Sequence, residues 1–304
     1  MDILTIGEAL IDFKQSQNLK FEGFEGGSPL NVAVAAARLG ANVGFAGQIS
    51  TDLFGKVITQ HIADNKIDTS YLLEHDSPTT LAFVAEINND AHFSFINNGA
   101  ADTLYNPQPR PEFPKELQFL MFGSISLLTE PTASSIEDIV ASHQASTTIV
   151  FDPNVRPALI TNKEEYLTRL HKWLELADIV KLSRQDLEWL YPKKYFKNVA
   201  LDWLQLNPAA IIITDGEKGA NLYRKNQELI SSKVYKVDVL DTVGAGDTFS
   251  AALMVSLLNK DINNISNLQW QESLDFAALA AALNCTKAGA NPPSLKLIEN
   301  YQKS

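Results

Sequence analysis

The sequence predicts a layered α/β fold in which helices pack on a mostly parallel β-sheet. Short apolar runs typical of buried strands alternate with segments of helical period over most of the 304 residues. Two further segments break this alternation and have the pattern of strands outside the main sheet. The chain is therefore expected to combine an α/β core with a small additional β-sheet.

The strands of the core are predicted from six apolar runs, at 3–7, 42–47, 117–123, 147–152, 178–183 and 209–216. Helices are predicted between several of them, at 29–39, 131–144, 163–177 and 185–191. The last third differs. Two antiparallel strands are expected within 219–237, followed by helices at 247–259 and 270–286.

The additional sheet is predicted from two places. Residues 79–96 have the pattern of two strands joined by a turn at Asn88-Asn89-Asp90, and residues 11–24 alternate aromatic and polar side chains. A hairpin beside an α/β core is either a lid over a site or a surface ribbon. With no repeat or linker in the sequence, one domain with a protruding subdomain is expected.

Composition narrows the class of protein. The 25 basic and 36 acidic residues give a net charge of −11, which argues against general nucleic-acid binding and means that a bound polyanion needs local donors. The single cysteine, Cys285, allows no intrachain disulfide and fits a reducing compartment, so a cytoplasmic protein is expected. No apolar run reaches the length of a membrane span, and the first residues resemble a strand rather than a signal peptide.

The stretch DTVGAGDTFSAAL, from Asp241 to Leu253, has the features of an anion site at a helix start. The N–H groups of Gly244, Ala245 and Gly246 precede the predicted helix, and the N–H groups of its first turn have no partners within it. Asp247 would repel a phosphate, so its presence there makes sense as a base that takes a proton from an attacking hydroxyl. The alternative is that Asp247 only caps the helix.

A second stretch, GGSPLNVAVAAARLG, leads from two glycines into an Ala-rich helix. Gly26 and Gly27 allow a ligand to approach the backbone, and Asn31 can both donate to and accept from hydroxyl groups. The alternative interpretation is a turn followed by a helix packed tightly on the sheet.

Together these two stretches resemble the paired signatures of the ribokinase-like (PfkB) family of carbohydrate kinases. Between them, GEALIDF, GQISTDLFG, FDPNVRP, DIVKLS and ITDGEKGA follow in the family's order. Within the family, FDPNVRPAL and GEALIDF are most similar to fructokinases. The resemblance implies one Rossmann-like α/β/α domain over 1–304, with a β lid from roughly 11–24 and 79–100.

It also implies an enzyme that transfers the γ-phosphoryl group of ATP to a sugar hydroxyl. Asp247 would be the general base, and Gly244, Ala245 and Gly246 would form the anion hole. The positions that would bind the sugar are Asp12, Gly26, Gly27, Asn31 and Arg156. Arg156 is a candidate clamp for sugar or phosphate oxygens, with a surface ion pair as the alternative.

For the nucleotide, the resemblance implies contacts from Lys181, Thr214, Gly216, Gly219 and Gly244. Mg²⁺ would arrive with ATP and keep several waters. Six positions resemble those at which family members bind a monovalent cation such as K⁺, mostly through carbonyl oxygens. They are Asp241, Val243, Asn284, Lys287, Gly289 and Ser294.

Two departures from the family pattern bear on function. Where the family has Asn-x-x-Glu, this chain has Ser183-Arg184-Gln185-Asp186, so the carboxylate expected in the Mg²⁺ network, Asp186, is one methylene shorter. Residues 76–109, which include the lid hairpin, contain no lysine or arginine. This favours a neutral sugar, with fructose the first choice.

Other functions stay open at this point. Ribose, a nucleoside or 2-keto-3-deoxygluconate are alternative substrates, and a sugar sensor without catalysis is a different class of protein. A dinucleotide-dependent oxidoreductase would need G-x-G-x-x-G after the first strand, where this chain has GEALID. Alternating apolar residues at 81–87 and 93–96 suit a lid that pairs with a second copy, or one that covers only its own site.

Overall fold

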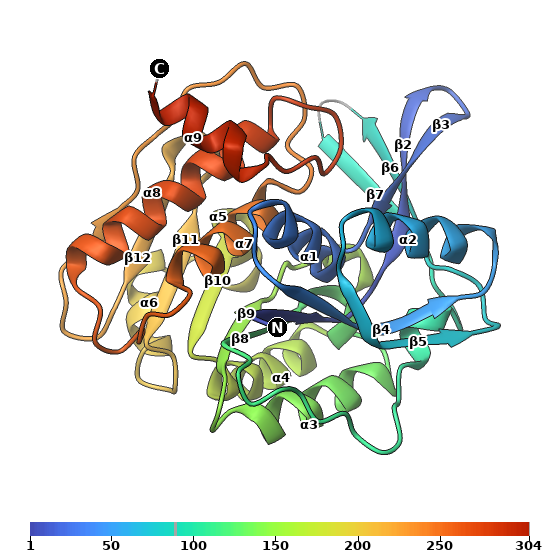
Figure 1. Ribbon diagram of the computed structural model, residues 1–304, viewed down its shortest axis with the longest axis horizontal. Helices are drawn as coiled ribbons and strands as arrows, with labels where there is room; N and C mark the ends of the chain where they lie inside the picture. The colour runs from blue at the N-terminus through green and yellow to red at the C-terminus, as the bar shows by residue number, and fades with distance from the viewer. Residues whose placement is uncertain (88–89, 304) are drawn as a thin grey trace.

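The computed structural model describes residues 1–87 and 90–303, and within these ranges nine strands form a central sheet (Figure 1). The strands are β1 (Ile3–Ile6), β4 (Val43–Ser50), β5 (Asp68–His75), β8 (Phe119–Gly123), β9 (Thr148–Asp152), β10 (Ile179–Ser183), β11 (Ala210–Thr214), β12 (Ala220–Tyr223) and β13 (Ile230–Ser231). Their order is β13-β12-β11-β10-β9-β8-β1-β4-β5. Pairing is parallel from β11 to β5 and antiparallel at the β11-β12-β13 edge.

Helices cover both faces of this sheet. One face carries α1 (Ser28–Arg38), α2 (Leu53–Asp64), α7 (Ala245–Leu257), α8 (Asn267–Asn284) and α9 (Leu295–Lys303). The other carries α3 (Thr132–His143), α4 (Lys163–Leu176), α5 (Arg184–Leu190) and α6 (Phe196–Trp203). Successive β1 residues alternate between the two cores, Ile3 in one and Leu4 in the other. The three-layer α/β/α fold expected from the sequence is confirmed.

Four strands of the described chain form a second sheet, at the upper right of Figure 1. They are β2 (Leu10–Gln17), β3 (Lys20–Gly26), β6 (Leu81–Ile87) and β7 (Asp90–Ile96), in the order β3-β2-β6-β7. Asn88 and Asn89 of the expected turn lie outside the described residues. Phe13 stacks on Phe83 at 5.2 Å between ring centroids and meets Phe54 of α2 edge-on at 5.7 Å. One side of this sheet therefore rests on the body of the protein.

Some boundaries differ from the sequence-based expectation. The second antiparallel strand was expected to run towards 237, but β13 covers only Ile230–Ser231. The chain after it follows α8 instead, because the Lys233 N–H donates to the Asp275 carboxylate at 2.6 Å rather than to a neighbouring strand. Three α-helices and one strand were not predicted: α2, α6, α9 and β5.

None of the helices in the described ranges combines the length and the apolar character needed to cross a bilayer.

The arrangement that matters for function is the edge at which the parallel strands end. Asp152, Ser183 and Thr214 are the last residues of β9, β10 and β11, which are neighbours in the sheet. Ligands of open α/β sheets bind beyond this carboxyl edge.

Candidate active site

A cavity of about 590 Å³ lies between the four-stranded sheet and the carboxyl edge of the central sheet. Most of the residues that the sequence singled out meet there. Those that line the cavity are Asp12, Gly27, Asn31, Arg156, Lys181, Asp241, Val243, Gly244, Gly246, Asp247 and Gly289. Elements far apart in the chain thus contribute to one site.

Asp247 occupies the first turn of α7, which begins at Ala245, close to the predicted start at 247. Gly244 precedes the helix in the left-handed conformation, with φ 72°, and a β-carbon there would lie 2.6 Å from the Ala290 side chain. The N-cap residue is Gly244, and no side chain of the described residues makes a capping hydrogen bond there. The alternative that Asp247 serves only as a helix cap is therefore wrong.

The Asp247 carboxylate is held by donors from the other glycine-led helix. The Ser28 hydroxyl donates to Oδ1 at 2.7 Å, and the Asn31 amide donates to Oδ2 at 2.8 Å. Burial raises the pKa of Asp247, and the bonds from Ser28 and Asn31 and the charge of Lys181 offset only part of this rise. A raised pKa makes the carboxylate a stronger base than an exposed aspartate.

Asp12 lies on β2 of the four-stranded sheet and Arg156 lies in the loop after β9, and both line the same cavity. Burial raises the pKa of Asp12 to about 6, against the opposing charge of Arg156. The Arg156 guanidinium donates to the Asn154 side chain at 2.6 Å. Gly26 lies beside Asp12, since a β-carbon at Gly26 would be 2.1 Å from the Asp12 carboxylate.

Glu8 is a further cavity residue that the sequence did not single out. Its carboxylate accepts hydrogen bonds from the Ser126 hydroxyl and, at 3.2 Å, from the Ser28 N–H. Burial raises the pKa of Glu8 to about 7. Glu8 thus holds Ser28, which in turn holds Asp247.

Glu8→Gln is expected to reduce the pH dependence of stability. Because the folded pKa of Glu8 is about 7 and its ordinary value is 4.5, ionising the buried carboxyl costs stability as pH rises through this window. The cost amounts to about 3 kcal/mol. Urea unfolding at pH 5 and pH 8 should show a smaller loss in the variant. An equal loss in both proteins would contradict the assignment.

Lys181 lies on the floor of the site. Its ammonium pairs with the Asp152 carboxylate at 2.8 Å, and both side chains are at least 95% buried. Burial would lower the pKa of Lys181, but Asp152 more than offsets this, and the pKa is raised. A β-carbon on Gly246 would lie 2.8 Å from the ammonium, so this charge sits directly against the start of α7.

Asp186 makes structural hydrogen bonds at the start of α5. Its carboxylate accepts from the Ser183 N–H at 2.8 Å and the Ser183 hydroxyl at 2.7 Å, which completes a capping box at α5. The Val155 N–H donates to its other oxygen at 3.0 Å. Asp186 therefore fixes the loop that carries Arg156. Its expected part in a Mg²⁺ network stays a prediction.

The expected nucleotide turn lies outside this cavity. Thr214 ends β11 beside Ser183 of β10, and Gly216 and Gly219 follow with positive φ. None of these three lines the cavity. The turn shares the carboxyl edge of the sheet with Lys181, so the expected sugar and nucleotide positions lie along one edge.

The residues expected to bind a monovalent cation are only partly brought together. Asp241 accepts from the Gly289 N–H at 2.9 Å and the Val243 N–H at 3.2 Å, and the Asn284 amide donates to the Val243 carbonyl at 2.8 Å. Lys287 follows Asn284 at the end of α8. Ser294 precedes α9 and accepts from Leu297 instead.

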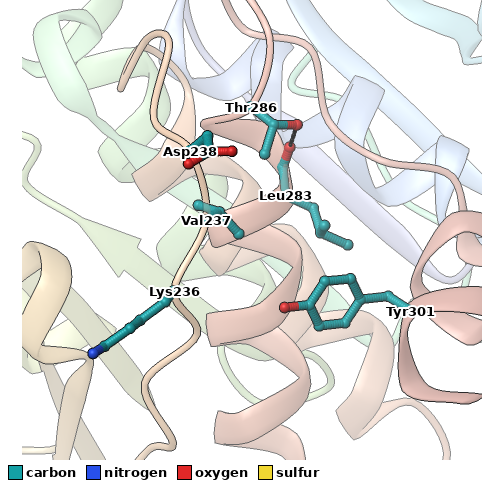
Figure 2. Close-up of a pocket in the computed structure, with 6 residues that line it drawn as sticks. All are labelled: Lys236, Val237, Asp238, Leu283, Thr286 and Tyr301. Atoms are coloured by element: carbon teal, nitrogen blue, oxygen red, sulfur yellow. Dashed lines mark hydrogen bonds between the residues drawn. The ribbon is translucent and has the colours of Figure 1, made fainter. Parts of the chain in front are cut away.

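A second pocket, of about 470 Å³, lies between the segment before Asp241 and helices α8 and α9 (Figure 2). The Tyr301 ring points towards α8 in this view, whereas the Lys236 side chain extends away. The Thr286 hydroxyl donates to the Leu283 carbonyl at 2.8 Å. None of the residues expected in the active site lines this pocket.

Known proteins are similar to this chain in both sequence and fold. A fructokinase from Rhizobium leguminosarum bv. trifolii is 33% identical over 91% of this chain and 85% of its own length. A fructokinase double mutant from Vibrio cholerae O395, solved with fructose, ADP and a potassium ion bound, has a TM-score of 0.89 at 26% identity, covering 99% of this chain and 98% of that one. The aminoimidazole riboside kinase from Salmonella enterica, complexed with aminoimidazole riboside and an ATP analog, has a TM-score of 0.88 at 26% identity over 99% of both chains.

The family model described as pfkB family carbohydrate kinase matches residues 1–297, which is nearly the whole chain. It spans both glycine-rich stretches, the four-stranded sheet and the helix that carries Asp247. The chain belongs to the pfkB family of carbohydrate kinases.

Proposed function

We propose that this protein is an ATP-dependent fructokinase, which converts fructose and ATP to fructose 6-phosphate and ADP. The observation that carries the proposal is the position of Asp247. A buried carboxylate with a raised pKa lines the cavity beside the first N–H groups of α7. A base and an anion hole at one point are what phosphoryl transfer to a hydroxyl requires.

In the proposed reaction, Asp247 accepts the proton of the fructose 6-hydroxyl. The hydroxyl oxygen forms the new bond to the γ-phosphorus as the bond to the ADP oxygen breaks. The Gly246 N–H at the start of α7 and the Lys181 ammonium stabilise the negative charge of the transferred group. Ala245, also expected in the anion hole, instead donates its N–H to the Thr242 carbonyl at 3.2 Å. Ser28 and Asn31 keep the carboxylate aimed at the hydroxyl through their hydrogen bonds.

A neutral sugar suits the rest of the cavity. Asp12 accepts hydrogen bonds from sugar hydroxyls, and Arg156 donates to sugar or phosphate oxygens. Both side chains line the cavity, and the positive charge of Arg156 opposes the rise in the pKa of Asp12. A carboxylated sugar would place a second negative charge near Asp12, and residues 76–109 offer no lysine or arginine to offset it.

Gly26→Ala is expected to lower kcat/KM for fructose by about 10²-fold, mainly through KM, because the new β-carbon would displace the Asp12 carboxylate. Steady-state kinetics at saturating ATP would measure this. Gly23→Ala on the same strand is the control, because a β-carbon there meets only the rings and methyl groups of Phe13 and Ile11 at 3.1 Å or more. Equal effects of the two variants would contradict a role for Asp12 in sugar binding.

ATP would lie along the carboxyl edge, with its phosphates at Lys181 and Gly244 and the rest at the turn that holds Thr214, Gly216 and Gly219. Mg²⁺ would enter with ATP and neutralise phosphate charge. We place this ATP-dependent reaction in the cytoplasm. Pairing of two copies through the lid stays a prediction.

An ADP-release assay with fructose, ribose, a nucleoside and 2-keto-3-deoxygluconate tests the proposal. Fructose should give the highest kcat/KM. A higher kcat/KM with the nucleoside would favour a second candidate function, that of a nucleoside kinase. The similarity to the aminoimidazole riboside kinase points to this candidate. Binding of fructose without ADP release from any sugar would mean a sensor rather than an enzyme.

A further inference from the structure

We propose that Lys14, on lid strand β2, takes the place of a monovalent cation at Asp241 and thereby joins the lid to the anion hole. The inference rests on the proposed function, because it assigns Lys14 a positioning role in that reaction. It also makes a statement about ion binding that can be tested without turnover.

The first observation is the ion pair itself. The Lys14 ammonium lies 2.7 Å from Asp241 Oδ2, across 227 residues of sequence. The Asp241 side chain is 6% exposed, whereas that of Lys14 is 46% exposed. A buried carboxylate needs a compensating charge, and Lys14 supplies it by reaching in from the lid.

The second observation concerns the oxygen atoms that a cation would use. Asp241 Oδ2 accepts from both Lys14 and the Gly289 N–H, and Oδ1 accepts from the Val243 N–H. The Val243 carbonyl accepts from the Asn284 amide, and the Asn284 side-chain oxygen accepts from the Thr248 hydroxyl at 3.3 Å. Asp241 Oδ2 therefore already accepts from two protein donors, one of them an ammonium, and this atom does not fit an added cation.

The third observation is that both strands of the β2–β3 hairpin meet the same loop. A β-carbon on Gly289 would lie 3.1 Å from the Phe24 ring of β3, so the ring packs closely on the backbone of that residue. Gly289 is also the residue whose N–H donates to Asp241. Lys14 and Phe24 thus fix the hairpin against the loop that adjoins Gly244 and Ala290.

A charge fixed in the lid has a consequence for the reaction. Asp241 opens the DTVGAGD stretch, so whatever neutralises it also sets the geometry of Gly244 and the first N–H groups of α7. When the lid is in the position seen here, Lys14 provides that neutralisation. Turnover should then be independent of K⁺.

The test compares the protein with its Lys14→Met variant in KCl and in tetramethylammonium chloride of equal ionic strength. Unfolding temperature and the initial rate with fructose and MgATP are measured. Lys14→Arg keeps the charge, and Lys20→Met makes the same substitution at an exposed lid position on β3. These two are expected to behave like the unsubstituted protein.

The unsubstituted protein should give rates within about twofold in the two salts, since no cation is bound. In tetramethylammonium, Lys14→Met should lose about tenfold in kcat and about 2–4 °C in unfolding temperature. K⁺ should restore both, because the vacated position at Asp241 can then accept it.

Three results would overturn the inference. They are a tenfold activation of the unsubstituted protein by K⁺, an unimpaired Lys14→Met in tetramethylammonium, or an impaired one that K⁺ does not rescue. If fructose is not phosphorylated in any salt, the proposed function fails. The unfolding temperatures then still test whether Lys14 replaces a cation at Asp241. A rise with K⁺ only in Lys14→Met supports the inference, and a rise in the unsubstituted protein overturns it.

Discussion

Asp247→Asn is expected to lower kcat with fructose by about 10²- to 10⁴-fold, because the amide cannot take the proton of the sugar hydroxyl. KM for fructose and for ATP should change little, since the side chain keeps its shape. Stopped or coupled assays at saturating substrate measure kcat, and unfolding by urea checks that the variant is folded.

The hydrogen bonds around Asp247 allow this substitution. The new side-chain oxygen can accept from the Asn31 amide as Oδ2 does now, and the new NH₂ group can donate to the Ser28 hydroxyl, which is able to accept. Asp102→Asn is a matched control, because Asp102 is also a buried carboxylate, bonded to the Thr80 hydroxyl at 2.5 Å, and does not line the cavity. A kcat of Asp247→Asn within tenfold of the unsubstituted value would show that Asp247 is not the base.

The interior of the fold could be predicted from the sequence because its central strands are buried on both faces. β8 and β11, for example, form continuous apolar runs. The missed β5 lies at the edge of the sheet beside β4 and is mostly exposed, so its sequence, DTSYLLEH, carries little apolar pattern. Elements at the edge of a sheet bury fewer of their residues, so their sequences show a weaker apolar pattern.

The residues of the site also differ in how far their roles could be predicted from the sequence. Gly244 and Asp247 lie within one short stretch whose composition already indicates an anion site. Ser28 and Glu8 were missed, because their roles depend on partners 219 and 118 residues away. No local pattern records such contacts.

Asp152 was within reach of sequence reasoning. β9 and β10 are neighbouring parallel strands, and Phe151 pairs with Val180, so Asp152 and Lys181 are the next residues of each strand. Opposite charges at matching positions of two buried strands predict an ion pair. The missing step was the register, which the structure supplies.

Lys181→Met is expected to lower the free energy of unfolding by about 3–5 kcal/mol, because it leaves the Asp152 carboxylate buried without its cation. The Asn154 N–H, at 3.1 Å, would remain as a donor to Asp152 but carries no charge. Activity should fall as well, since the ammonium against Gly246 is lost from the anion hole.

The double variant Asp152→Asn/Lys181→Met separates these two effects. Removing the carboxylate charge should recover more than half of the lost stability, because a neutral amide tolerates burial better than an unpaired charge. It should not recover kcat, because no positive charge returns beside the start of α7. Urea unfolding and steady-state kinetics on both variants measure the two quantities. Recovery of kcat together with stability would mean that Lys181 serves only to neutralise Asp152, and that the N–H groups of α7 alone carry the transferred charge.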